Sequence, residues 1–189
     1  MGHEHMSSDK HPEPQVLLDN SREIFSCEEV MAAVDRMAEE INRFYGNEPI
    51  VMVAVMTGAI IPAAWLATRL KMPLQMDFVH ATRYQSGLYG AELEYRVPPR
   101  LDLEGRKVLV VDDIFDEGDT LAAIKGSCEK RKAESVQLAV LVRKEHERGL
   151  PRDYVDFVGL DVPDVYVYGC GMDAYEEWRH LDRILALET

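Results

Sequence analysis

Residues 108–121 read Val108-Leu109-Val110-Val111-Asp112-Asp113-Ile114-Phe115-Asp116-Glu117-Gly118-Asp119-Thr120-Leu121. Four branched apolar residues open this segment, which is typical of a strand buried on both faces of a parallel sheet. Asp112 and Asp113 end the apolar run, and a short loop with a third acid follows. Apolar residues then recur at helical spacing, at Leu121, Ile124 and Cys128. The segment therefore predicts a strand, an acidic loop and a helix.

The loop in this segment has the composition of a ligand site. Open α/β sheets bind ligands beyond the carboxyl ends of their strands. Gly118 lets the backbone come close to a ligand, and the N–H groups of the first helical turn, with the Thr120 hydroxyl, can hold a phosphate. Asp112 and Asp113 can accept hydrogen bonds from a sugar diol and help to hold a hydrated Mg²⁺. One Asp here would as readily start a plain turn, but three acids, a glycine and a threonine at this spacing favour binding.

Length and charge limit the possible functions. The chain has 189 residues, enough for one domain that buries about 70% of its unfolded surface. Its 21 basic and 34 acidic residues give a formal net charge of −13, which repels nucleic acid and anionic membranes. No apolar run approaches the ~20 residues that span a bilayer, and no signal-peptide pattern is present. Three cysteines without metal-ligand spacing favour reduced thiols. We therefore expect a cytoplasmic protein that binds neither nucleic acid nor a membrane.

The rest of the chain alternates helical and strand patterns. Residues 1–14 are polar and are expected to form a disordered leader, with a single domain over 15–189. Ser26 and Glu29 have the spacing of a capping box. Residues 81–100 are rich in Gly, Tyr and charge, and their alternation suggests a two-stranded arm. The remaining patterns predict helices over about 27–45 and from 59 onward, and strands over 50–55, 74–80, 135–142, 155–160 and 165–169.

Residues 108–121 also resemble the phosphoribosyl diphosphate (PRPP) signature of the type I phosphoribosyltransferases: hydrophobic run, acid, acid, two residues, Asp, any residue, Gly, any residue, Thr. Residues 158–185 resemble the hood of the hypoxanthine-guanine phosphoribosyltransferases, with Val-Gly-x-x-x-Pro-Asp and then an aromatic residue, Gly, Asp, Tyr and Arg. The resemblance covers about residues 16–185. It implies a twisted, mostly parallel α/β sheet flanked by helices, with a core over about 27–160, a hood from about 15–26 and 161–189, and a flexible lid arm.

The resemblance also implies a role for each site residue. Asp116 is the implied catalytic base, hydrogen-bonded at N7 of the purine. Asp112 and Asp113 would hold the ribose hydroxyls and Mg²⁺, and Asp173 a second Mg²⁺. The other implied contacts are Glu117, Gly118, Asp119 and Thr120 to the 5′-phosphate; Met56, Thr57, Gly58 and Arg179 to pyrophosphate; Arg83 and Tyr84 in the lid; and Lys144, Tyr166 and Val167 to the purine. In this family the peptide bond before the second loop residue is commonly cis, so we expect a cis Met56–Thr57 bond.

The chain departs from the family pattern at a few positions. Glu117 replaces the usual Thr and Asp119 an often neutral or basic residue, and two carboxylates beside a phosphate are unfavourable unless they turn outward. Arg83 replaces a Ser and adds a cation, and Asp112 replaces the commoner Glu. At the end of strand 135–142, Arg143 and Lys144 both lie near the place of the lysine that donates to the purine 6-oxo group; Lys144 fits better.

The resemblance implies purine salvage: Mg²⁺-dependent transfer of phosphoribosyl from PRPP to hypoxanthine or guanine, giving the nucleotides IMP or GMP and pyrophosphate. Small-molecule substrates and a homodimer or homotetramer are expected. One alternative is an RNA-binding attenuation regulator on the same scaffold, which would need a basic face that the net charge opposes. Another is a phosphoribosyltransferase for xanthine or a pyrimidine. Lys144 and Tyr166 favour a 6-oxopurine but do not rank hypoxanthine, guanine and xanthine.

Overall fold

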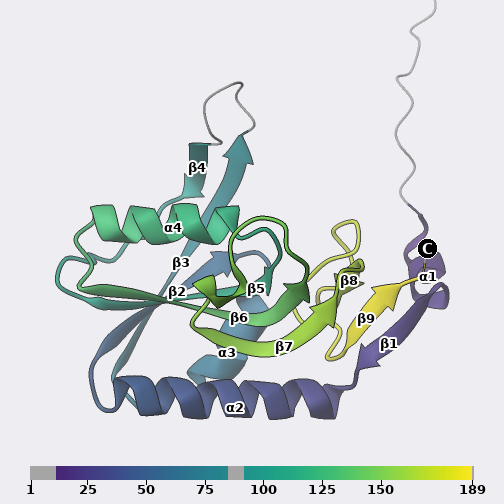
Figure 1. The fold of residues 1–189 in the computed structure, drawn as a ribbon, viewed down its shortest axis with the longest axis horizontal. Helices are drawn as coiled ribbons and strands as arrows, with labels where there is room; N and C mark the ends of the chain where they lie inside the picture. Colours follow the sequence, from purple (N-terminus) through teal and green to yellow (C-terminus); the bar gives the residue numbers. More distant parts are fainter. Residues whose placement is uncertain (1–11, 85–91, 189) are drawn as a thin grey trace, which may run out of the picture.

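A computed structural model describes residues 12–84 and 92–188, without the side chains of 82–84 and 92–94. Its main sheet has six strands in the order β4-β3-β2-β5-β6-β7, and every neighbouring pair is parallel except β3 and β4. The predicted mostly parallel α/β sheet is confirmed (Figure 1). The strands are β2 (Ile50–Met56), β3 (Leu74–Tyr84), β4 (Glu92–Val97), β5 (Lys107–Phe115), β6 (Ser135–Glu145) and β7 (Phe157–Pro163).

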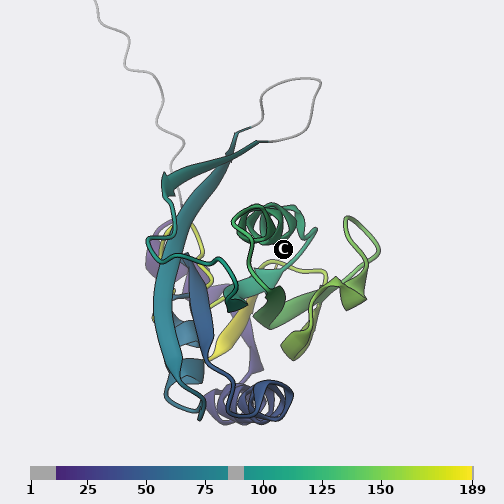
Figure 2. The same cartoon turned by 90° about the vertical axis from the view of Figure 1, so that its left-hand side faces the viewer.

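Helices cover both faces of this sheet (Figures 1 and 2). The helix α2 (Cys27–Tyr45) packs on β7 and on α3 (Ile60–Ala67), while α4 (Asp119–Lys130) lies on the opposite face over β5 and β6. The predicted capping box starts α2: the Ser26 hydroxyl accepts the Glu29 N–H, and the Glu29 carboxylate accepts the Ser26 N–H. One apolar core fills the space between the sheet and the helices on each of its faces, because β2 and the first half of β5 are apolar on both sides.

Strand ends differ from the sequence prediction. β5 does not stop before Asp112 but continues to Phe115, and β6 continues past Val142 to Glu145. The strands are longer because the hydrogen-bonded pairing of β5 with β6 continues past Asp112 and Asp113, up to the pair of Phe115 and Arg143. β7 is shifted toward the C-terminus of its predicted range, 155–160, and includes Asp161 to Pro163. The predicted strand at 165–169 is reduced to β8 (Val167–Tyr168).

A second, three-stranded antiparallel sheet joins the two ends of the chain. It has the order β1-β9-β8, from β1 (Ser21–Phe25), β8 and β9 (Ile184–Leu187), and the short helix α1 (Pro14–Asp19) leads into it. Tyr168 is fully buried here and donates its hydroxyl proton to the Ser21 hydroxyl. We call this sheet, residues 164–166 that lead into β8, and the loop at 169–183 the hood; it lies beside the main sheet, on the side of β7 in Figure 1.

The arm extends from the main sheet where β3 pairs with β4 (Figure 2). The predicted lid residues Arg83 and Tyr84 end β3, and their side chains lie outside the described part of the structure. The predicted leader at 1–14 lies mostly in residues 1–11, which are also outside it. Within the described ranges, none of the helices combines the length and the apolar character that crossing a membrane requires.

Candidate active site

The acidic loop (residues 116–120) connects β5 to α4. Gly118 has φ of 86° and is the N-cap of α4, so the helix begins one residue before Thr120. The left-handed φ suits glycine, and an added Cβ there would collide with Phe115. A cavity of about 320 Å³ opens above this turn, which is the lower end of the size of small-ligand sites. The structure brings to it all seven residues predicted to hold the ribose phosphate or act as base, together with Ile114 and Leu121: the lining is Asp112, Asp113, Ile114, Asp116, Glu117, Gly118, Asp119, Thr120 and Leu121.

A second loop packs against the acidic loop. The Leu150 N–H donates to the Glu117 carbonyl at 2.9 Å, and Gly149, at φ of 74°, lies against the Glu117 backbone. This segment, residues 146–150, follows β6. It holds the acidic loop in place through the Glu117 backbone.

Asp112 and Asp113 form a partly buried acid pair near the end of β5. Burial, and for Asp112 the charge of Asp113 as well, raises the pKa of both carboxyls, that of Asp112 well above its ordinary value. The Asp113 N–H donates to Asp112 Oδ1 at 2.9 Å, and the positive charge of Arg179 partly offsets the rise at Asp113. Such a pair is stabilised by hydroxyl donors or by a cation.

Magnesium fits this acid pair. Mg²⁺ prefers carboxylate oxygens and usually takes one or two from the protein, with water and substrate phosphate completing its shell. The described residues contain no cluster of three or more His, Cys, Asp or Glu side chains placed to hold a metal. Asp173, which is predicted to bind a second Mg²⁺, lies 2.7 Å from Arg179 Nη2 and accepts the Glu176 N–H at 2.9 Å.

The loop after β2 meets the acid pair and the hood. The Met56–Thr57 peptide bond is cis, as the family resemblance implied. Gly58 lies directly against the Asp113 carboxylate, and its carbonyl lies against Gly171 of the hood. Arg179 donates to the Gly171 carbonyl at 2.9 Å. Of the predicted pyrophosphate residues, Gly58 and Arg179 therefore lie near Asp113, with Thr57 next to Gly58 in the loop, whereas Met56 lines an apolar hollow with Ile60 and Met76.

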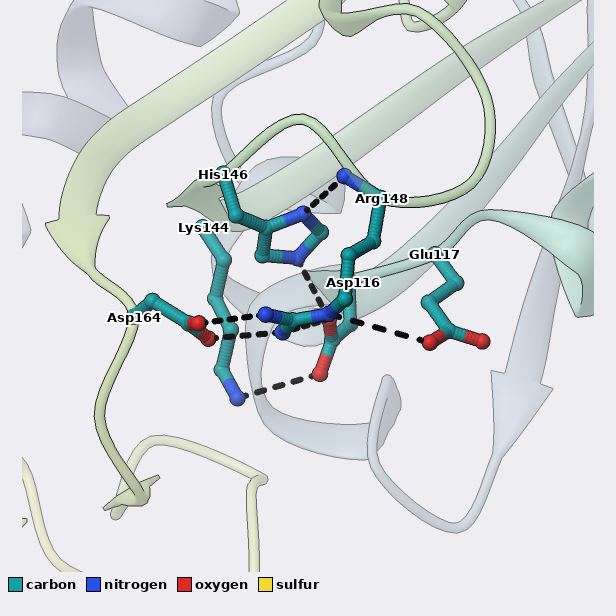
Figure 3. Close-up of polar contacts among 6 residues, drawn as sticks. All are labelled: Asp116, Glu117, Lys144, His146, Arg148 and Asp164. Atoms are coloured by element: carbon teal, nitrogen blue, oxygen red, sulfur yellow. Dashed lines mark hydrogen bonds and ion pairs between the residues drawn. The ribbon is translucent and has the colours of Figure 1, made fainter.

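Asp116 is held by two donors from the end of β6 (Figure 3). Because Phe115 pairs with Arg143, the next residues along the two strands, Asp116 and Lys144, also come together. Lys144 Nζ lies 3.0 Å from Asp116 Oδ2, and His146 Nε2 lies 2.6 Å from Asp116 Oδ1. Burial alone would raise the pKa of Asp116, but the hydrogen bonds and charges of Lys144 and His146 outweigh it and lower that pKa. Arg143 points elsewhere, to Asp161 and the Arg152 carbonyl.

Two residues of this cluster were missed in the sequence. His146 and Arg148 lie in the charged run after Lys144, which reads as a solvated turn. Arg148 makes a bidentate pair with Asp164, at 2.6 and 2.8 Å, and its Nε lies 3.8 Å from Glu117 Oε1. The Glu117 carboxylate thus turns toward Arg148. The positive charge of Arg148 offsets the negative charge that Glu117 would otherwise place beside a bound phosphate. The alternation of acids and bases over 143–148 was the available signal.

The predicted purine residues Tyr166 and Val167 lie at the start of β8 in the hood. Tyr166 is 45% exposed, stacks on Tyr175 with ring centroids 6.4 Å apart, and donates its hydroxyl proton to the Asp173 carbonyl. Val167 lies in β8 opposite Ala186 with its side chain buried. Asp164, the partner of Arg148, comes two residues before Tyr166, so the hood and the acidic loop are joined through one cation.

Comparison with known proteins identifies the family to which this chain belongs. The family model described as "Phosphoribosyl transferase domain" matches residues 20–176. The chain belongs to the phosphoribosyltransferase family. It is 31% identical over 172 residues to the hypoxanthine-guanine phosphoribosyltransferase of Bacillus subtilis strain 168, covering 90% of this chain and 94% of that protein. A relative named hypoxanthine-guanine-xanthine phosphoribosyltransferase, from Tritrichomonas foetus, is 27% identical over 169 residues, 89% of this chain and 92% of that one.

Solved structures of phosphoribosyltransferases have the same fold. A hypoxanthine phosphoribosyltransferase from Staphylococcus aureus superposes with a TM-score of 0.84 over 92% of this chain and 95% of that one, at 24% identity. A hypoxanthine-guanine phosphoribosyltransferase from Bacillus anthracis gives a TM-score of 0.79 at 28% identity, over 87% and 96%. The family and fold predicted from residues 108–121 and 158–185 are confirmed.

Proposed function

We propose that this phosphoribosyltransferase transfers the phosphoribosyl group of PRPP reversibly to N9 of hypoxanthine or guanine and releases pyrophosphate. The observation that carries the proposal is the Asp116–Lys144 pair, whose carboxylate residue, Asp116, lines the acidic-loop cavity. A carboxylate and an ammonium side by side offer an acceptor and a donor, which match the N7–H and the 6-oxo group of a 6-oxopurine. The relatives of this chain carry names of the same activity.

Each part of the substrates has a matching set of groups. The 5′-phosphate would bind to the N–H groups of the acidic loop and the first turn of α4, and to the Thr120 hydroxyl. The ribose hydroxyls would donate to Asp112 and Asp113. The purine would stack on Tyr166, with Val167 offering its backbone to the base edge, and Arg83 and Tyr84 would close the arm over the reacting carbon.

The chemistry needs charge stabilisation at three places. Positive charge develops at C1′ of the ribose, next to the acid pair. Negative charge develops on the leaving pyrophosphate, which Arg179 and the loop Met56-Thr57-Gly58 would stabilise. The purine loses a proton, which Asp116 would accept. Asp112, Asp113 and Asp173 would hold Mg²⁺, which supplies further positive charge for the diphosphate when bound.

Lys144 does not rank hypoxanthine, guanine and xanthine, because it would contact the 6-oxo group that all three share and they differ at C2. The Tritrichomonas foetus relative, named for all three, keeps xanthine in the proposal. A pyrimidine acceptor is the remaining enzymatic alternative. An RNA-binding regulator is opposed by the net charge of −13.

Association of copies of the chain into a dimer or tetramer is part of the same proposal. Four exposed apolar side chains support it: Ile60, Met76, Phe78 and Val97, which line two adjoining hollows beside Met56. Sedimentation of the protein and of Phe78→Glu would show whether this face is buried between copies. A cytoplasmic location accords with the three free thiols.

The deciding experiment incubates the protein with PRPP, Mg²⁺ and a panel of free bases, scoring nucleotide and pyrophosphate. We expect product with hypoxanthine or guanine and none with pyrimidines. Asp116→Asn removes the proton acceptor and should reduce kcat by about 10²- to 10⁴-fold. Nucleotide formation by Asp116→Asn near the wild-type rate would refute the assignment of the base, and no product with any oxopurine would refute the function.

A further inference from the structure

We propose that His146 is a positioning residue that fixes the Asp116 carboxylate by binding Oδ1, so that Oδ2 is the oxygen presented to the purine. This inference rests on the proposed function, because it assigns a partner to the proposed base. It concerns a residue that belongs neither to the family signature at 108–121 nor to the hood pattern.

The tautomer of His146 follows from its two hydrogen bonds. The Arg148 N–H donates to His146 Nδ1 at 3.1 Å, so Nδ1 is an acceptor and carries no proton. The proton of the neutral ring therefore sits on Nε2, which lies 2.6 Å from Asp116 Oδ1. His146 is then a donor to the carboxylate and holds no free lone pair with which to take a proton from it. A proton relay through the ring is excluded by this arrangement.

The two oxygens of Asp116 differ in how firmly they are held. The His146 side chain is 7% exposed, and its ring is fixed at both nitrogens. The Lys144 side chain is a long flexible chain with a single ion pair to Oδ2. When a 6-oxopurine takes the Lys144 ammonium as donor, Oδ2 is released toward N7 while Oδ1 stays bound.

Other charges face this carboxylate and remain constant when His146 is replaced. Arg148 Nη2 lies 3.7 Å from Asp116 Oδ1, Lys144 lies at Oδ2, and Glu117 and Asp164 face Arg148. Lys144 also donates a hydrogen bond to Asp116, at 3.0 Å, but the His146 bond is shorter, at 2.6 Å, and comes from a more deeply buried side chain (Figure 3). Its loss should loosen the carboxylate and remove one of the contacts that lower the pKa of Asp116.

The test compares three replacements of His146. The amide nitrogen of Gln reaches the place of Nε2, that of Asn stops near Nδ1, and Leu has no donor. We expect His146→Leu and His146→Asn to lower kcat by about tenfold or more, with the KM for PRPP within twofold of wild type. His146→Gln should recover most of kcat. Glu147→Gln, an exposed position on the same loop, is the matched control.

The pH profile separates positioning from folding. The acidic limb of kcat/KM, set by Asp116 as base, should move to higher pH in His146→Leu and His146→Asn and stay in place in His146→Gln. Carboxyl carbon-13 NMR of the ligand-free protein measures the pKa of Asp116 directly and needs no enzyme assay. The rise of this pKa can therefore be tested even if the proposed function is wrong. An unmoved Asp116 pKa in both the Leu and the Asn variants would overturn the inference, as would a Gln variant no better than Asn. If the Leu variant does not fold, the Asn and Gln pair decides.

Discussion

Gly58 and Asp113 approach each other so closely that a side chain at position 58 would take the place of the Asp113 carboxylate. On its other side, the Gly58 carbonyl leaves no room for a side chain at Gly171, which has φ of 109°. The loop after β2, the acid pair of β5 and the hood therefore meet at two glycines. This contact places the proposed pyrophosphate and ribose sites side by side.

Gly58→Ala should disable the site by moving Asp113. The added methyl group cannot be accommodated without displacing the Asp113 carboxylate, because it would overlap with both carboxylate oxygens. We expect the KM for PRPP to rise and kcat/KM to fall by at least tenfold, as measured by steady-state kinetics. Wild-type kinetics in this variant would show that the position of Asp113 is unimportant.

A glycine in open surroundings supplies the control for that replacement. Gly126 lies within α4, and a Cβ added there meets nothing within 4 Å. Gly126→Ala should raise the free energy of unfolding by about 0.4–1 kcal/mol, because alanine loses less backbone entropy in a helix. Its kinetics should equal those of the wild type. A loss of activity in Gly126→Ala would mean that α4 responds to any replacement.

Arg148→Met should weaken PRPP binding through Glu117. Arg148 faces both Glu117 and Asp164, and without it the Glu117 carboxylate would stand uncompensated beside the proposed phosphate site. We expect the KM for PRPP to rise severalfold, and more at low ionic strength, because exposed charges are screened by salt.

The double variant Arg148→Met with Glu117→Gln tests that explanation. Removing the carboxylate should restore most of the lost PRPP affinity, since the repulsion then has no source. A double variant as impaired as Arg148→Met alone would place the effect at Asp164 and the hood instead.

Local signals in the sequence were enough to predict the helices and the buried strands. The capping residues Ser26 and Glu29 and a regular apolar spacing define α2, whose observed bounds match the prediction. The strand β2 and the first half of β5 are apolar on both faces, a pattern typical of a covered parallel sheet. These features depend on residues close together in the chain.

The side-chain contacts that depend on the register between β5 and β6 could not be predicted from the sequence. Asp116 meets Lys144 and His146 because β5 and β6 pair with Phe115 opposite Arg143, and the apolar runs of both strands would tolerate other offsets. His146 is separated from Asp116 by 30 residues, and nothing in the charged run at 143–148 marks it as the buried member. The ends of β5 and β6 were also misjudged, because polar residues that face a cavity look like loop residues.

Lys144→Met tests whether Lys144 or Arg143 donates a hydrogen bond to the 6-oxo group of the purine. Loss of a charged hydrogen bond to the 6-oxo group costs about 1.5–3 kcal/mol, so kcat/KM for hypoxanthine and guanine should fall by about 10- to 100-fold. The KM for PRPP should change little. Arg143→Met is the matched control: its guanidinium binds Asp161, so this variant should lose stability and keep its purine kinetics. The reverse pattern would assign the purine contact to Arg143.

Asp112→Asn should stabilise the ligand-free protein while abolishing its use of PRPP. The pKa of Asp112 is raised in the folded state by burial and by the charge of Asp113, from an ordinary value of 3.8. At pH values between the ordinary pKa and the raised pKa of the folded state, the folded protein binds more protons than the unfolded chain. The free energy of unfolding therefore decreases as pH rises through this range. Asn carries no charge and escapes this loss. The Tm of Asp112→Asn minus that of the wild type should therefore increase from pH 4 to pH 7, whereas the exposed Asp153→Asn should show no such trend. A difference that shrinks with pH would mean that the acid pair is stabilised in its charged form without any ligand.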